Sequence, residues 1–171
     1  MTVSNATPLI YLARLNKLQL LKEIFTQIQI PPEVKIETID RGKEKGYPDA
    51  YAIEQAMSDG WLIQESLTQK TIEKSEALAH MMRIDIGEAQ AIILAKQKNE
   101  KDILIDQTNA RAVARNLGLN PRGTIFVILT ALKRKLITKD NAKQMLDKLI
   151  EANFYISVDI YRDTLKTIEK L

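Results

Sequence analysis

Short apolar runs alternate with longer amphipathic stretches along the whole sequence. The apolar runs are typical of buried strands, whereas the apolar positions of the longer stretches recur at helical spacing. The predicted strands are Val3–Ser4, Gln27–Ile30, Trp61–Ile63 and Ile103–Ile105. Parallel neighbours need a crossover of about a dozen residues or more, which the helical stretches supply. The alternation therefore predicts an α/β fold in which helices cover both faces of a parallel sheet.

Cap and turn residues set the predicted boundaries of the helices. Thr7 is expected to cap the first helix, with Pro8 at the first helical position. The helix from Glu33 is expected to fray at Arg41–Gly46, a polar stretch with glycines that predicts a mobile loop. Tyr155–Ser157 is a candidate for a further short strand. The other predicted helices are Lys17–Phe25, Pro48–Met57, Thr71–Met82, Ala89–Lys98, Asn109–Leu117, Thr124–Leu132, one from Thr138 or Asp140 to Ile150, and a last one from Asp159.

The composition is that of one packed domain, which we expect to span residues 1–171. The chain has no cysteine, which excludes disulfides, thiolate metal sites and cysteine nucleophiles. His80 is the only histidine, and its helical setting favours a packing or surface role over a Ser-His-Asp relay. The chain has no basic leader, and no uncharged apolar run approaches the roughly 18 residues of a membrane span. We therefore expect a cytoplasmic protein without membrane contact.

The charge balance gives a weak indication of the partner. Lysine and arginine number 25 against 22 acidic residues, so the formal net charge is +3. A mild basic excess favours a polyanionic partner such as nucleic acid. A solvated lysine surface explains the same excess, so charge alone leaves both interpretations open.

Four polar side chains are expected at the carboxyl edge of the predicted sheet. Asn5 follows the first strand, Glu37 lies in the helix after the second, Glu88 opens a helix, and Asp106 ends a buried strand. Carboxylates clustered there would repel one another unless a hard cation such as Mg²⁺ or Mn²⁺ neutralised them. Each also has a structural explanation: Asp106 as a cap, Glu88 at a helix N-terminus, Glu37 as an exposed helical residue, and Asn5 in a turn.

Several segments together resemble the PIN-domain family of metal-dependent ribonucleases, and most closely a VapC-like prokaryotic subgroup. The resemblance covers nearly the whole chain and rests on the order and spacing of its parts. These parts are Val3–Ile10, Ile30–Val34 before Glu37, Gly87–Ile92, Leu104–Asp106 with Ala110–Arg111, and Gly118 through Thr124. It implies a three-layer α/β/α sandwich with a short, mostly parallel central sheet and one or two Mg²⁺ or Mn²⁺ ions at its acidic edge.

The resemblance also implies roles for these residues. Glu88 and Asp106 would be the principal metal ligands, and Glu37 a ligand through water or a proton acceptor. Asn5 would be a neutral ligand or position a water, and Thr124 would lie near the metals. Asn5 departs from the family, whose first position is usually Asp, and an amide adds no negative charge.

The partners that the resemblance implies are an RNA substrate, a small antitoxin protein and a second copy of the chain. Arg111 and Arg115 lie four residues apart in the helix after Asp106, so they are candidates for binding a substrate phosphate. An intramolecular ion pair is the alternative for both. A catalytically inactive nucleic-acid-binding or interaction protein on the same fold is the alternative function, and a purely structural subunit is a third.

Overall fold

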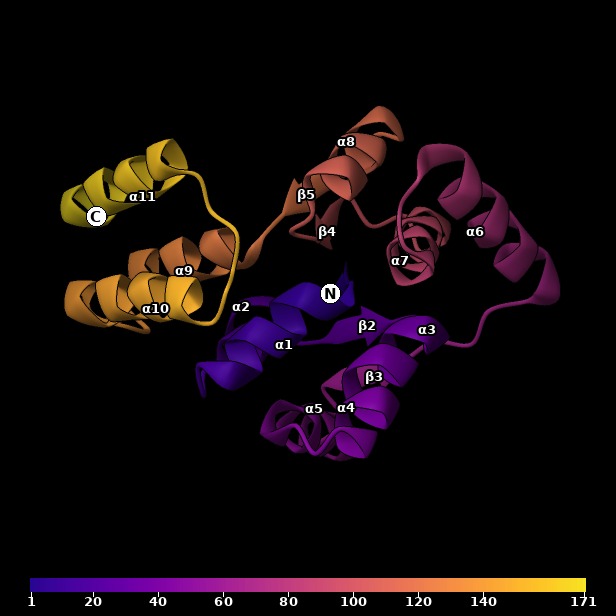
Figure 1. Cartoon of the computed structure of the whole chain (residues 1–171), viewed down its shortest axis with the longest axis horizontal. Coiled ribbons are helices and arrows are strands. Elements are labelled where there is room, and N and C mark those ends of the chain that lie inside the picture. Colours follow the sequence, from indigo (N-terminus) through magenta and orange to yellow (C-terminus); the bar gives the residue numbers. More distant parts are fainter.

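The computed structural model describes residues 1–171. Its centre is a five-stranded, all-parallel sheet with helices on both faces (Figure 1). The strands are β1 (Thr2–Ser4), β2 (Ile28–Ile30), β3 (Leu62–Gln64), β4 (Asp102–Leu104) and β5 (Asn120–Arg122). The predicted three-layer α/β/α sandwich with a short parallel sheet is confirmed.

The order of the strands across the sheet is β3-β2-β1-β4-β5, so the chain builds outward from β1 in both directions. Val3 of β1 lies opposite Gln29 of β2 on one side and Ile103 of β4 on the other. The strand order therefore reverses between β1 and β4. In open parallel sheets, the crevice beyond the carboxyl ends of the strands at such a point is the usual place for a ligand.

Two apolar clusters fill the spaces between the sheet and its helices. Because side chains alternate along a strand, Ile28 and Ile30 join the larger cluster, whereas Val3 and Ile103 join the smaller one. Most of the larger cluster comes from α1 (Ala6–Arg14), α2 (Gln19–Phe25), α5 (Pro48–Ser58), α9 (Thr124–Lys133) and α10 (Lys139–Glu151), and Val34, Ile39 and Ile168 join it from other helical segments. The helices of the smaller cluster are α7 (Ile86–Gln97) and α8 (Thr108–Asn116).

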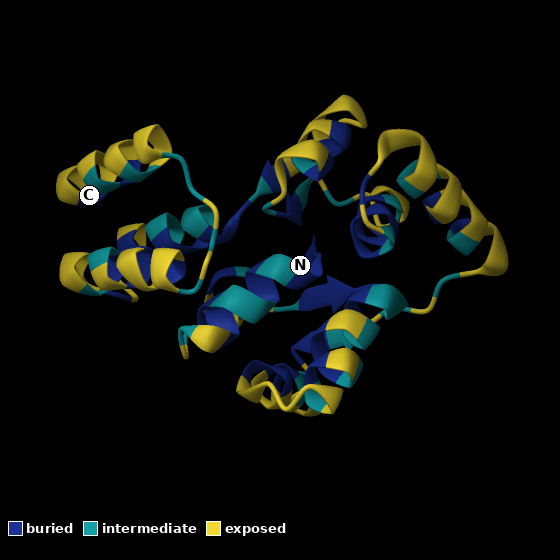
Figure 2. Ribbon diagram, in the orientation of Figure 1, coloured by how far each residue is buried: buried dark blue, intermediate teal, exposed yellow.

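The remaining helices lie farther from the sheet. Helix α6 (Gln69–Met82) packs on α7, and α11 (Val158–Lys170) packs on α9 and α10. Figure 2 shows that the central strands are buried, whereas exposed residues lie along the outer sides of the helices. Ile168 is fully buried, so the C-terminal helix packs on its own chain. None of the helices is long and apolar enough to cross a bilayer.

The predicted loop at Arg41–Gly46 is wrong for most of its length. The chain continues from α3 (Pro32–Lys35) through a π-helical turn (Ile36–Asp40) into α4 (Arg41–Glu44). Gly42 is buried, and a Cβ atom there would lie 2.8 Å from the Cβ of Ala50. The glycine thus permits α4 to approach α5 closely, which explains why it does not break the helix.

Two other local predictions are also wrong. Asn5, not Thr7, occupies the N-cap position of α1, and the Thr7 hydroxyl donates to Oε1 of Gln107 at 3.2 Å. Tyr155–Ser157 forms no strand, because Ser157 caps α11 by accepting a hydrogen bond from the Ile160 N–H at 3.3 Å. The fifth strand is β5, which the sequence analysis missed.

Candidate active site

Asn5 lies at the switch point of the sheet with an unused acceptor. Its backbone N–H donates to the Leu104 carbonyl at 3.0 Å, which continues the pairing of β1 with β4. The side chain is buried, and its Nδ2 donates to Oε1 of Gln107 at 3.2 Å. Its Oδ1 is buried without a hydrogen-bond partner. A buried acceptor without a partner is costly, so this oxygen is suited to a ligand.

Asp106 follows β4 and is fixed by the start of α9. The Thr124 N–H donates to Asp106 Oδ1 at 2.8 Å, and the Thr124 hydroxyl donates to Oδ2 at 2.7 Å. Burial raises the pKa of the Asp106 carboxyl, although both Thr124 hydrogen bonds oppose that rise. A Cβ at Gly123 would lie 2.6 Å from Asp106 Oδ1, so only glycine permits this approach. Thr124 therefore lies beside Asp106.

Glu88 uses only one of its two carboxylate oxygens inside the protein. It forms a capping box with Asp85 at the start of α7, in which Oε2 accepts the Asp85 N–H at 3.1 Å. Its Oε1 is buried without a partner. Burial raises the pKa of the Glu88 carboxyl to about 7, and the charges of Asp85 and Glu37 act in the same direction. Glu88 is thus a helix-stabilising residue that keeps one free oxygen.

Glu37 lies in the π-helical turn and faces the start of α7. Its Oε2 would be 3.3 Å from a Cβ at Gly87. Burial raises the pKa of the Glu37 carboxyl, Asp85 raises it further, and Arg41 opposes the shift. Glu37 borders a polar cavity of about 470 Å³ that also contains Glu33 and Asp85. Single π turns inside helices occur often at functional sites.

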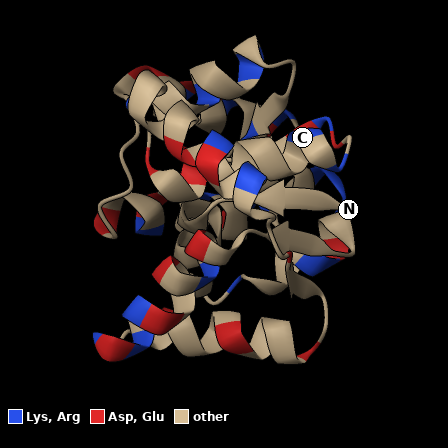
Figure 3. Ribbon diagram, turned by 90° about the vertical axis from the view of Figure 1, so that its right-hand side faces the viewer, with Lys and Arg blue, Asp and Glu red and all other residues tan.

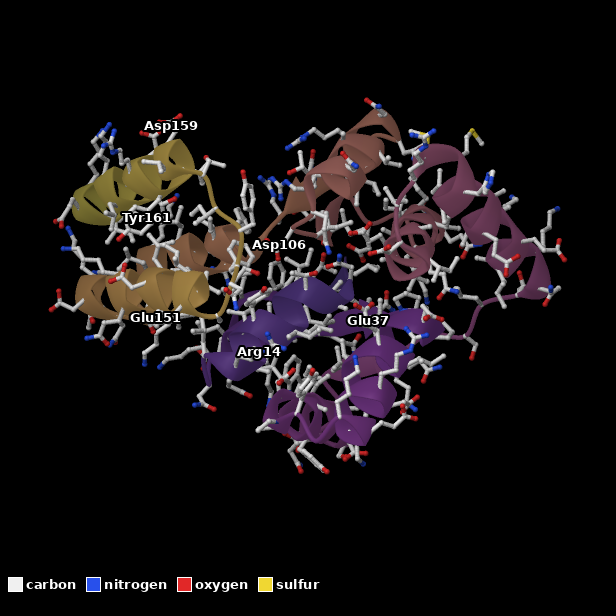
Figure 4. All side chains as sticks on the ribbon, in the orientation of Figure 1. Arg14, Glu37, Asp106, Glu151, Asp159 and Tyr161 are labelled. Carbon is white, nitrogen blue, oxygen red and sulfur yellow. The ribbon has the colours of Figure 1, made fainter.

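The four predicted residues lie at one edge of the sheet but form two groups. Glu37 and Glu88 interact electrostatically beside α7, together with Asp85. Asp106 lies instead with Thr124 and Arg111. Figure 4 shows Glu37 on the side of α3 and Asp106 toward α8 and α9. No three acidic residues are close enough to form one metal-binding group.

The donor atoms nevertheless fit a hard divalent cation. The unpartnered atoms Glu88 Oε1 and Asn5 Oδ1 are oxygens, which Mg²⁺ and Mn²⁺ prefer. The pKa values of Glu37 and Glu88 are both raised, chiefly by burial, and the only opposing cation is Arg41 beside Glu37. Asp106 keeps free lone pairs despite its bonds to Thr124, because an ionised carboxylate offers about four acceptor positions.

Three arginines surround a second cavity, of about 530 Å³, beside Asp106. The sequence analysis identified Arg111 and Arg115, and the structure adds Arg122 from β5. Neither Arg111 nor Arg115 forms a salt bridge. Burial lowers the pKa of Arg111, and the charges of Arg115 and Arg122 contribute to that shift. Arg111 instead donates to the Ile105 carbonyl at 2.9 Å and interacts electrostatically with Asp106.

Sequence reasoning missed Asp85 and Arg122. Asp85 carried a detectable signal, because Asp-x-x-Glu before an apolar run is a capping-box pattern. Arg122 carried none, because its strand was not predicted.

A family model described as a PIN domain matches residues 1–170. No curated protein matches the chain.

Proposed function

Because this chain belongs to the PIN-domain family, we propose that it is a metal-dependent endoribonuclease that hydrolyses RNA with Mg²⁺ or Mn²⁺. The observation that carries the proposal is that Glu88 Oε1 and Asn5 Oδ1 are each buried without a hydrogen-bond partner. They belong to a polar group beyond the carboxyl ends of the strands, where parallel sheets place their active sites. Burial and the neighbouring carboxylates Asp85 and Glu37 raise the pKa of Glu88 to about 7, which a bound cation would oppose.

The proposed roles are those that the resemblance to the family implies for these residues. Glu88 and Asp106 are the principal metal ligands, Asn5 is a neutral ligand, and Glu37 accepts a proton or holds a ligating water. A bound divalent cation supplies positive charge that polarises the phosphodiester and eases deprotonation of the attacking water. Thr124 orients Asp106 through its two hydrogen bonds. Asp106 and Glu88 belong to the two separate groups described above. We therefore propose that each carboxylate contacts the metal site from its own side.

The proposed cellular role is that of a toxin in a toxin–antitoxin pair. This rests on the resemblance to VapC-like proteins described above. With this role we also propose an RNA target, a small antitoxin protein that blocks the acidic edge, a homodimeric state and a cytoplasmic location. The proposal treats residues 1–171 as one PIN-like domain.

The first experiment is calorimetric titration of Mn²⁺ into the parent protein and into Asp106→Ala and Glu88→Gln. We expect the parent to bind and each variant to bind at least about tenfold more weakly, as loss of a ligand or its support does in metal sites. Glu76→Gln is the matched control, because Glu76 is an exposed glutamate on α6. The same variants are then tested for Mg²⁺-dependent cleavage of RNA, which Asp106→Ala should abolish.

Two observations favour the second candidate, an inactive RNA-binding protein of the same fold. Asn5 carries no negative charge, and both oxygens of Asp106 are already bound by Thr124. This candidate predicts RNA binding that is independent of metal, with no cleavage. If the parent fails to bind Mn²⁺ at millimolar concentration, the second candidate replaces the first.

A further inference from the structure

The cavity beside Asp106 combines two kinds of side chain that serve different parts of a nucleotide. Its basic side is formed by Arg111, Arg115 and Arg122. Its other side is formed by aromatic residues of α9 and of the connection between α10 and α11, namely Phe126, Phe154 and Tyr155. We call it the arginine–aromatic cavity. Its volume of about 530 Å³ lies within the roughly 300–1,000 Å³ usual for small-ligand sites.

The basic side of the arginine–aromatic cavity has excess positive charge. Arg111 donates to the Ile105 carbonyl at 2.9 Å, which fixes its guanidinium beside Asp106. Arg115 is exposed and has no salt bridge, and Arg122 has only a half-exposed partner, Asp102, at 3.3 Å. An exposed salt bridge of this kind contributes little to stability. The mutual repulsion of the three guanidinium groups would be relieved by a bound phosphate, because arginine pairs with phosphate through two parallel hydrogen bonds.

The aromatic side offers two surfaces for a planar ligand. The Arg122 guanidinium lies 4.7 Å from the centre of the Phe126 ring, so the two form a cation–π pair. The Tyr155 side chain is 90% exposed, and its ring has no aromatic, cation–π or hydrogen-bond partner in the chain. An exposed, unpartnered tyrosine at the border of a basic cavity contributes little to folding but suits base stacking.

We propose that the arginine–aromatic cavity binds one unpaired nucleotide of single-stranded RNA, with its phosphate on Arg111 and Arg115 and its base stacked on Tyr155. The inference rests on the proposed ribonuclease function and assigns a subsite for one base and its phosphate. A base inside a duplex has both faces covered by its neighbours, so it cannot stack on a side chain. The protein should therefore select unpaired RNA on the side of Asp106 that faces α9 and α11.

The test is RNA binding without divalent cations, where cleavage cannot occur. The probe is a single-stranded oligonucleotide of about 8 nucleotides that carries one fluorescent 2-aminopurine, whose emission is quenched on stacking. Tyr155→Ala should weaken binding by about 5- to 100-fold and remove the quenching, because one stacked base contributes about 1–3 kcal/mol. Tyr155→Phe keeps the ring and should bind like the parent.

The controls separate stacking from other effects. Tyr51→Ala removes another exposed tyrosine, on α5, and should leave RNA affinity unchanged. A duplex of the same sequence should bind more weakly, with an affinity that Tyr155→Ala does not alter. Because Tyr155 is almost fully exposed, its replacement does not threaten folding.

Three results would overturn the subsite: equal affinity of parent and Tyr155→Ala, a Tyr155→Phe variant as weak as Tyr155→Ala, or no RNA binding by the parent at low salt. Equal affinity of the parent and Tyr155→Ala would instead favour a protein partner for the exposed surface around Tyr155. These outcomes are separable from failure of the proposed function. If Tyr155-dependent binding occurs without metal-dependent cleavage, the subsite stands and the ribonuclease proposal fails. If Mg²⁺-dependent cleavage occurs and Tyr155→Ala does not affect it, the ribonuclease proposal stands and the subsite fails.

Discussion

Glu88 illustrates how one side chain serves both helix and site. Its Oε2 closes the capping box of α7, whereas its Oε1 is buried and free. The sequence predicted the position of Glu88 because the pattern of an apolar helix start is local. It could not predict which oxygen stays free, because that depends on packing against segments distant in the sequence, such as the one that carries Glu37.

The raised pKa of Glu88 makes the metal-free protein sensitive to pH. The folded pKa of about 7 exceeds the ordinary value of 4.5, so the folded state retains a proton that the unfolded state loses. Stability should therefore fall as pH rises between these two values. Glu88→Gln stays neutral, and in EDTA it should be more stable than the parent by roughly 1–3 kcal/mol at about pH 8, with little difference near pH 4.

Urea unfolding of both proteins across this pH range measures the difference. Glu76→Gln, which replaces an exposed glutamate, should keep the pH slope of the parent. If the stabilities of the parent and Glu88→Gln depended on pH in the same way, burial would not raise the pKa of the Glu88 carboxyl.

At the scale of elements, the π-helical turn at Ile36–Asp40 is the feature that sequence patterns do not reveal. Its residues fit an ordinary helix equally well, and the extra residue of a π turn leaves no mark on composition. The turn is supported by the Thr38 hydroxyl, which donates to the Val34 carbonyl at 2.8 Å, and by the ion pair of Lys35 with Asp40 at 2.7 Å. It brings Glu37 beside Gly87 and leads directly into α4.

The contact between α4 and α5 gives a test at this scale. Gly42→Ala would place a Cβ 2.8 Å from that of Ala50, and overpacking of this kind costs about 1–3 kcal/mol. Ala50→Gly removes the opposing atom, at a cost of about 1 kcal/mol for glycine inside a helix. The double variant should therefore be more stable than the sum of the two single changes predicts. Denaturant unfolding of all four proteins completes the cycle, and strict additivity would mean that the helices do not meet at Gly42.

Strand β5 was missed for a related reason. Asn120-Pro121-Arg122 lies between Gly118 and Gly123, and such a stretch indicates a turn when it is considered alone. It becomes a strand only because β4 lies beside it, with Ile103 opposite Pro121. The longer helices and the buried strands were predictable because their periodicity is local, whereas a short edge strand depends on its neighbour.

At the scale of the whole molecule, the net charge of +3 is spread, not concentrated. On the face in Figure 3, basic and acidic residues are interspersed over the helices. The sequence could give the sum of the charges but not their distribution. The local excess at Arg111, Arg115 and Arg122 arises because α8 and β5 are adjacent in the fold.

If RNA phosphates contact this local excess, Arg115→Ala should reduce the dependence of RNA affinity on salt. The slope of log K against log salt should fall in magnitude by about 1, because one phosphate contact and its counterion release are lost. Lys74→Ala removes an exposed, unpaired charge from α6 and should leave the slope unchanged. Titrations at several salt concentrations, without divalent cations, make the comparison. An unaltered slope for Arg115→Ala would place the phosphate elsewhere.

Pro121 also determines how the sheet ends. The Asn120 N–H points inward to the Lys101 carbonyl at 2.7 Å, so the alternation of the backbone turns the next nitrogen outward. That nitrogen belongs to proline and carries no hydrogen. The open side of β5 therefore lacks a donor at its midpoint, which disfavours the addition of a strand from another molecule. Pro121, which makes this segment resemble a turn in the sequence, therefore also disfavours edge-to-edge aggregation of the sheet.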